Sequence, residues 1–177
     1  MPILYILCGL PFSGKTILAK KLAEKFGFEQ VSIDEIRFAH GFPWEDSKIT
    51  AKDWQKIFDE SYQRTQEFLQ NGKSVLYDSA NQDRVSRDRL RKLAKEVGVA
   101  AKVIWLDIPL EIIKKRYKEN TITQERFHLP EKFFNMAVNT YEVPKKDENV
   151  IRYTNAMDFN VWAEENFSDA SLVRMIS

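Results

Sequence analysis

The sequence has 177 residues, and its 27 lysine and arginine residues against 26 aspartate and glutamate residues leave a formal charge of +1. Hydrophobic residues make up 44% and charged residues 30%, a mixture that is typical of a globular domain and excludes a disordered chain. The near-neutral balance excludes a protein that coats nucleic acid by charge alone. The lone cysteine, Cys8, allows no internal disulfide and favours a reducing, cytoplasmic location.

Apolar runs alternate with longer segments of helical period along the chain. The apolar runs predict five strands, over residues 3–8, 30–33, 74–77, 99–106 and 150–153. The periodic segments predict helices over 15–26, 50–70, a basic segment that Gly98 ends, a segment from Pro109 through Tyr117, 131–141 and 158–167, with a loop over 120–130. Apolar strands separated by helices are typical of a parallel sheet covered on both faces. The pattern predicts a single α/β domain over residues 1–177, a three-layer sandwich around a five-stranded parallel sheet.

A glycine-rich phosphate-binding pattern lies between the first predicted strand and the first predicted helix. It matches G-x-x-x-x-G-K-[ST] and consists of Gly9, Leu10, Pro11, Phe12, Ser13, Gly14, Lys15 and Thr16. A phosphate loop requires this position, because backbone N–H groups and the positive end of the following helix surround the phosphates. The pattern predicts that Lys15 contacts the β- and γ-phosphates of ATP and that the Thr16 hydroxyl is a ligand of Mg²⁺.

Charged and polar residues follow the second and third predicted strands. Asp34 and Arg37 lie one helical turn apart after the second strand, and Asp78 ends the third. Because the carboxyl ends of parallel strands face one crevice, Asp34 is placed to accept a proton from an attacking hydroxyl and Arg37 to hold an anionic acceptor. Asp78 has the position of a carboxylate that supports Mg²⁺, and Asn81 follows at the same crevice. The alternative for Asp34 and Arg37 is a helix-capping aspartate and a surface arginine.

The order of these motifs resembles that of the small P-loop kinases, whose relatives include the kinase domain of phage polynucleotide kinase, chloramphenicol phosphotransferase and the zeta toxins. The segments that carry the resemblance are GLPFSGKT, SIDEIR, GKSVLYDSAN, VIWLDIPLEIIKKR and YEVPKKDE, and they cover about residues 3–153. The resemblance implies a nucleoside-kinase-like fold that transfers a phosphoryl group from ATP with the help of Mg²⁺. It also implies that Asp34 is the general base, that Arg37 contacts the substrate, and that Asp78 and Asn81 line the acceptor or metal site.

A mobile lid in these kinases supplies arginines to the transferring phosphoryl group, where they offset developing charge. The resemblance places this lid at about residues 116–130, with Arg116 and Arg126 as the candidates. The sequence departs from the family pattern at two positions. Phe12 stands where the family usually has glycine, and Asn120 stands where relatives often carry a further arginine.

Three further features of the sequence need an interpretation. Phe42 and Trp44 could stack on a ring of the acceptor, but an apolar plug beneath the long helix is favoured. Asp107, which closes the fourth strand just before Pro109, is interpreted as a helix cap. The basic helix is interpreted as a solvated face, with a phosphate-contacting subset as the alternative, because its positive side chains lie all round the helix: Arg84, Arg87, Arg89, Arg91, Lys92 and Lys95.

Local charge sharpens the meaning of the near-neutral total. Residues 83–95 carry six basic and two acidic side chains, a local charge of +4, whereas residues 142–169 carry three basic and seven acidic, a local charge of −4. The leading hypothesis is a kinase that phosphorylates a hydroxyl of a small molecule or of a nucleic-acid end, without a membrane partner. The alternatives are a non-catalytic ATP-binding switch and, specifically, a polynucleotide 5′-hydroxyl kinase.

Overall fold

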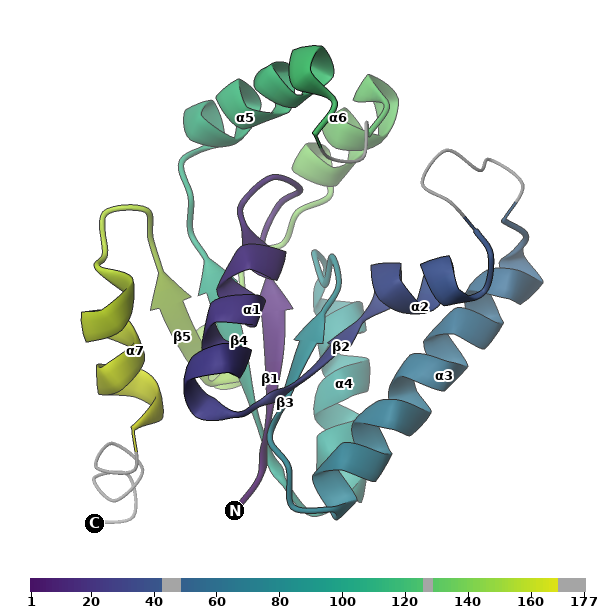
Figure 1. The fold of residues 1–177 in the computed structure, drawn as a ribbon, viewed down its shortest axis with the longest axis vertical. Helices are drawn as coiled ribbons and strands as arrows, with labels where there is room; N and C mark the ends of the chain where they lie inside the picture. Colours follow the sequence, from purple (N-terminus) through teal and green to yellow (C-terminus); the bar gives the residue numbers. More distant parts are fainter. Residues whose placement is uncertain (43–48, 126–128, 169–177) are drawn as a thin grey trace.

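A computed structural model describes residues 1–42, 49–125 and 129–168 of the chain. Five parallel strands form its central sheet in the spatial order β2-β3-β1-β4-β5. Their bounds are β1 Ile3–Cys8, β2 Glu29–Ser32, β3 Val75–Asp78, β4 Ala100–Leu106 and β5 Val150–Tyr153 (Figure 1). The predicted five-stranded parallel sheet is confirmed, and each predicted strand lies within one residue of its observed bounds.

Helices connect the strands in the alternation that the sequence predicts. The structure has α1 Lys15–Phe26, α2 Ile33–Ala39, α3 Ala51–Gln70, α4 Arg84–Glu96, α5 Leu110–Thr123, α6 Glu131–Asn139, the short 3₁₀ helix η1 Lys146–Glu148 and α7 Phe159–Phe167. Side-chain caps fix several starts, since the Thr50, Asp83 and Asp158 side chains accept hydrogen bonds from the first turns of α3, α4 and α7.

Two details around α5 differ from the prediction. The loop predicted over 120–130 is wrong at its start, because α5 continues to Thr123 with Asn120 buried on its inner side. The helix ends only where Gln124 adopts a positive φ of 50° and its N–H donates to the Asn120 carbonyl. Pro109 precedes the helix as its N-cap residue instead of lying in its first turn.

Each face of the sheet carries its own apolar core. Alternate residues of β1 point to opposite faces, so Ile3, Tyr5 and Leu7 belong to one core and Leu4, Ile6 and Cys8 to the other. The first core also includes buried residues of α1, α5, α6 and α7, and the second includes those of α2, α3 and α4. The sheet is therefore the middle layer of a three-layer sandwich, as predicted.

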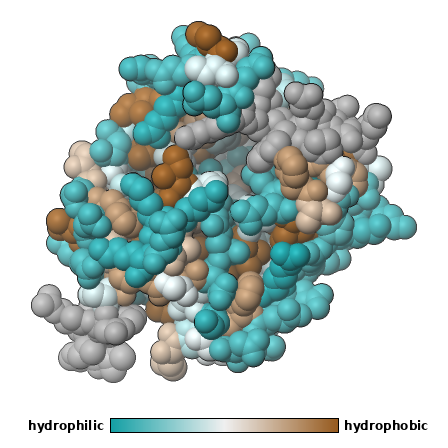
Figure 2. Space-filling view, viewed as in Figure 1, coloured by the Kyte–Doolittle hydropathy of each residue, from teal (hydrophilic) through white to brown (hydrophobic). Residues whose placement is uncertain are grey.

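The carboxyl edge of the sheet faces the helices α5 and α6. Figure 1 shows these two helices beyond the tips of the strands, over the loop that joins β1 to α1, whereas α2 lies lower, next to α3. In the same view, most of the molecular surface is hydrophilic, and a small patch of hydrophobic residues lies at the top of the molecule (Figure 2). Within the described residues, no helix is long and apolar enough to cross a membrane.

Candidate active site

The loop from Gly9 to Thr16 has the compact form of a phosphate cradle. A Cβ atom at Gly9 would meet the Ser13 Oγ at 2.8 Å and the Leu106 Cβ at 3.2 Å, so only glycine fits there without a shift. Gly14 takes a φ of 101°, which favours glycine, and it is the N-cap residue of α1. The loop therefore turns sharply from the end of β1 into the positive end of α1.

The Lys15 side chain folds back over this loop. Its ammonium group donates hydrogen bonds to the carbonyl oxygens of Gly9 at 2.8 Å and Leu10 at 3.1 Å. Burial lowers the pKa of Lys15, although the negative charges of Asp78 and Asp34 act in the opposite direction. The Ser13 Oγ of the same loop is buried and has no hydrogen-bond partner among the described residues. These groups give the loop a lysine and a hydroxyl with which to bind an anion.

Asp78 lies at the end of β3, directly beside the first turn of α1. Its carboxylate accepts hydrogen bonds from the Gln30 Nε2 at 3.0 Å and from the Thr16 hydroxyl. Burial raises the pKa of Asp78, while Lys15 and these hydrogen bonds oppose the rise. A hydroxyl and a carboxylate side by side are oxygen ligands of the kind that Mg²⁺ binds, so Thr16 and Asp78 fit the predicted ion.

Asp34 and Arg37 share the first turns of α2, which starts where β2 ends. Ser32 caps this helix, because its Oγ accepts a hydrogen bond from the Glu35 N–H at 3.3 Å. The capping alternative for Asp34 is therefore wrong, as is the surface alternative for Arg37, whose side chain is 8% exposed. The Arg37 Nη2 lies 3.8 Å from the Asp34 Oδ1, and the Asp34 side chain is 54% exposed. This places a reachable carboxylate at the carboxyl edge.

Arg116 reaches the phosphate loop from α5. Its Nη1 donates hydrogen bonds to the carbonyl oxygens of Phe12 at 3.1 Å and Ser13 at 3.2 Å. The structure thus brings this predicted lid arginine to the loop, although it lies 100 residues further along the sequence than Thr16. The other candidate, Arg126, lies outside the described residues.

Asn81 is also at this edge, but its side chain points beneath the loop. Its Nδ2 donates to the Leu7 carbonyl oxygen at 2.9 Å, and its own backbone carbonyl accepts from the Arg87 Nη1 at 3.1 Å. Asn81 adopts a positive φ of 42° in this position. Its amide nitrogen therefore joins the loop after β3 to the end of β1, a structural contact that the sequence pattern did not predict.

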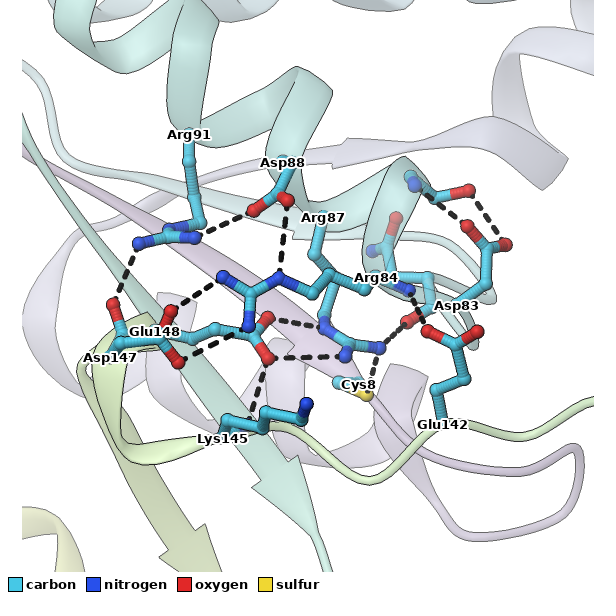
Figure 3. A network of polar contacts seen from close by, with 12 residues as sticks. Cys8, Asp83, Arg84, Arg87, Asp88, Arg91, Glu142, Lys145, Asp147 and Glu148 are labelled. Atoms are coloured by element: carbon cyan, nitrogen blue, oxygen red, sulfur yellow. Dashed lines mark hydrogen bonds and ion pairs between the residues drawn. The ribbon is translucent and has the colours of Figure 1, made fainter.

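Sequence reasoning also missed a polar network that joins α4 to the end of β1 and to the segment after α6 (Figure 3). Arg87 of α4 is fully buried and donates to both carboxylate oxygens of Glu148, at 2.6 and 3.2 Å, and its Nη1 lies 3.7 Å from the Cys8 Sγ. Arg84 pairs with Asp147 nearby. The solvated-face interpretation of the basic helix is therefore wrong for Arg87. The opposite local charges of residues 83–95 and 142–169 were the sequence feature that could have indicated this contact.

The aromatic candidates and Asp107 have structural surroundings. Phe42 packs against the second core, as the favoured interpretation requires, and Trp44 lies outside the described residues. Asp107 caps no helix, which corrects the prediction. Its Oδ2 accepts from the Arg152 guanidinium instead, at 2.8 Å from Nε.

A cavity of about 570 Å³ opens beside the phosphate loop, between α1, α5 and the segment after β5. Its walls include Gly14, Ile17, Arg116, Tyr153 and Asn155. The volume lies within the range of pockets that hold small molecules, and the walls combine apolar surface with amide and guanidinium groups. The cavity and Asp34 are thus two separate features next to the same loop.

Comparison with known proteins identifies relatives of this arrangement. A family described as AAA domain matches residues 4–144. The chain is 34% identical over 113 residues to the shikimate kinase of Persephonella marina, a match that spans 63% of this chain and 65% of that protein, slightly under two thirds. It is 27% identical over 151 residues to the adenylyl-sulfate kinase of Saccharomyces cerevisiae, over 82% of this chain and 73% of that protein. The structure of a sugar kinase from Janibacter sp. HTCC2649 superposes with a TM-score of 0.69 at 20% identity, over 100% of this chain and 99% of that one.

Proposed function

The chain belongs to the AAA domain family, and on this premise we propose that it is a kinase that transfers the γ-phosphoryl group of ATP, with Mg²⁺, to a hydroxyl of a small molecule. The observation that carries the proposal is the convergence at one edge of the sheet. Lys15 and Ser13 in the loop, the Thr16–Asp78 pair beside it, and Asp34 across from it supply the parts that phosphoryl transfer needs. The named relatives above are all kinases, which agrees with this reaction class.

The residues act as follows in the proposed reaction. The Asp34 carboxylate accepts the proton of the acceptor hydroxyl, whose oxygen forms a bond to the γ-phosphorus while the bond from that phosphorus to the β-γ bridging oxygen breaks. ADP leaves with the electron pair of the broken bond. Lys15 and Arg116 offset the negative charge of the transferring group, and Arg37 orients the acceptor. Thr16 and Asp78 would hold Mg²⁺, which would supply positive charge to neutralise the phosphates.

The cavity beside the phosphate loop is the proposed binding site for the nucleoside of ATP. With the phosphates in the loop, the nucleoside of ATP extends away from Asp34. The acceptor must reach the γ-phosphate from the side on which Asp34, the general base, lies. The cavity walls at Ile17 and Tyr153 offer apolar surface to the nucleobase, and the Asn155 amide offers hydrogen bonds.

The test separates nucleotide binding from chemistry. Lys15→Ala should abolish transfer from labelled ATP, because the loop then lacks its cation. Asp34→Asn should leave the Kd for ATP within about threefold but lower kcat by a factor of about 10² to 10⁴, the usual contribution of a general base. Asp59→Asn is the matched control, since it changes an exposed carboxyl of α3 in the same way and should retain full activity. Full activity of Asp34→Asn contradicts the assignment of the base.

The acceptor is identified by offering labelled ATP to two pools. One pool holds hydroxyl-bearing metabolites, including the substrate classes of the relatives above, and the other holds an oligonucleotide with a free 5′-hydroxyl. Label in the first pool supports the proposal. Label in the oligonucleotide alone replaces it with a polynucleotide kinase, and tight ATP binding with no labelled product supports a nucleotide-dependent switch.

A further inference from the structure

Three aromatic rings join the phosphate loop to the helices above it. The Phe12 ring lies edge-on to the Tyr117 ring of α5, with centroids 5.5 Å apart, and 6.3 Å from the Phe134 ring of α6. Tyr117 and Phe134 stack on each other at 4.3 Å with an interplanar angle of 11°. We call Phe12, Tyr117 and Phe134 the aromatic clamp. Its members come from three separate elements, so it can transmit a constraint between them.

The backbone of Phe12 shows that this contact is not incidental. Phe12 adopts a φ of 65°, in the left-handed region that residues with a Cβ rarely occupy and that costs free energy for a bulky side chain. Such a conformation persists only when surrounding contacts fix it. The ring contacts with Tyr117 and Phe134 help to fix it, together with the hydrogen bond that the Phe12 carbonyl oxygen accepts from Arg116, and Phe134 is itself buried in the core.

A polar contact lies next to the aromatic one. Arg116, the neighbour of Tyr117 in the sequence, donates to the carbonyl oxygens of Phe12 and Ser13. The Arg116 guanidinium also lies 3.9 Å from the position that a Cβ at Gly14 would take, so it covers the loop closely. The ring of Tyr117 and the guanidinium of Arg116 thus hold the same stretch of loop from the same helix.

We propose that Phe12 is a positioning residue, which fastens α5 and α6 to the phosphate loop through the aromatic clamp and thereby keeps Arg116 at the loop. The fastening is a property of the protein without nucleotide. Its consequence for phosphoryl transfer rests on the proposed function: with Arg116 already in place, bound ATP is covered at once and leaves slowly.

Phe12→Leu tests the fastening, because leucine keeps the apolar bulk and the Cβ but removes the ring. In the nucleotide-free protein, hydrogen exchange of the backbone amides of residues 110–123 and 131–139 should accelerate about tenfold, as loss of two aromatic contacts predicts. Phe12→Tyr, which keeps the ring, should exchange like the original protein. So should Phe133→Leu, a control on α6 whose side chain is 49% exposed. Unchanged exchange in Phe12→Leu overturns the proposal.

Tyr117→Leu supplies a second route that leaves the loop sequence intact, and it decides the question if Phe12→Leu does not fold. If the rings act as one unit, the Phe12→Leu/Tyr117→Leu double variant should exchange no faster than either single variant, whereas additive effects overturn the clamp. The dissociation rate of a fluorescent ATP analogue should rise about tenfold in both single variants, with kcat falling more than KM rises. If the unsubstituted protein binds no nucleotide, the proposed function is contradicted. The hydrogen-exchange measurement in the nucleotide-free protein still tests the aromatic clamp in that case.

Discussion

Asp34 is the residue on which the proposed chemistry depends, and its surroundings set its protonation. Although the Asp34 side chain is half-exposed, desolvation by the surrounding protein raises its pKa above the ordinary value of 3.8, and Asp78 raises it further, while Arg37 and Lys15 act in the opposite direction. A general base must be unprotonated to accept a proton. The free enzyme should therefore lose kcat/KM as the pH falls through this raised pKa, and the rate should level off above it.

A pH profile of kcat/KM measures this dependence, and Arg37→Gln gives it a direction. Removing the guanidinium takes away the largest influence that lowers the pKa of Asp34, so the inflection of the profile should move to higher pH. This shift is separate from any loss of rate that follows from weaker acceptor binding. An inflection that stays in place or moves to lower pH would show that Asp34 does not govern the profile.

The residues of the site differ in how far the sequence could predict them. The phosphate loop has a fixed spacing whose physical purpose is local, so Gly9, Gly14 and Lys15 could be assigned their places from the pattern alone. The ring contacts of Phe12 could not be predicted, because Tyr117 and Phe134 lie more than 100 residues away on α5 and α6. The motif correctly predicted that Asn81 lies at the carboxyl edge of the sheet. It could not predict the direction of the side chain, which is set by the hydrogen bond to the Leu7 carbonyl oxygen.

Among the elements, α4 and the segment after α6 neutralise each other. Arg84, Arg87 and Arg91 of α4 all donate to this segment, to Asp147 and Glu148, and the Glu142 carboxylate accepts from the N–H of Arg84 (Figure 3). The basic and the acidic segments, which cancel in the total charge, therefore also meet in space. Helical period could predict α4 but not this partner, because Arg87 and Glu148 are 61 residues apart.

The Arg87–Glu148 pair should be the most sensitive point of this contact. Both side chains are fully buried, so Arg87→Ala should lower the free energy of unfolding by about 3–5 kcal/mol, since it leaves a buried carboxylate without its partner. Lys92→Ala, at an exposed pair on the same helix, should cost about 0–1 kcal/mol. Urea unfolding followed by circular dichroism measures both. Equal losses in the two variants would contradict the structural importance of the buried pair.

The same pair should make stability depend on acid pH. Burial raises the pKa of Glu148, but hydrogen bonds from Arg87 and from the Lys145 N–H outweigh it, and the pKa lies below its ordinary value of 4.5. A lowered carboxylate pKa stabilises the folded state at pH values above 4.5, and this contribution is lost as the pH falls through the folded-state value. Glu148→Gln should therefore unfold with a weaker pH dependence in this acid range than the original protein.

At the scale of the whole molecule, the core extends beyond the region that the family match covers. That match ends at residue 144, yet β5 completes the sheet and α7 closes the first core. The centroid of the Trp162 ring lies 4.6 Å from that of Tyr153 and 5.3 Å from that of Phe167. The Phe167 centroid in turn lies 5.1 Å from that of Tyr5 of β1. The prediction of one domain over residues 1–177 therefore requires α7 to unfold together with the sheet.

Trp162→Ala tests this requirement. The side chain is buried and its Nε1 donates to the Arg152 carbonyl oxygen at 2.8 Å, so the substitution should cost about 3–5 kcal/mol of the free energy of unfolding. Its neighbour Val161 is 59% exposed, and Val161→Ala should change that free energy by no more than about 0.5 kcal/mol. If the chain is one cooperative unit, Trp162→Ala shifts a single urea transition for tryptophan fluorescence and circular dichroism alike. A separate early transition confined to α7, with the sheet unfolding at its original midpoint, would mean that the terminal helix is an attachment to the kinase core and not a part of it.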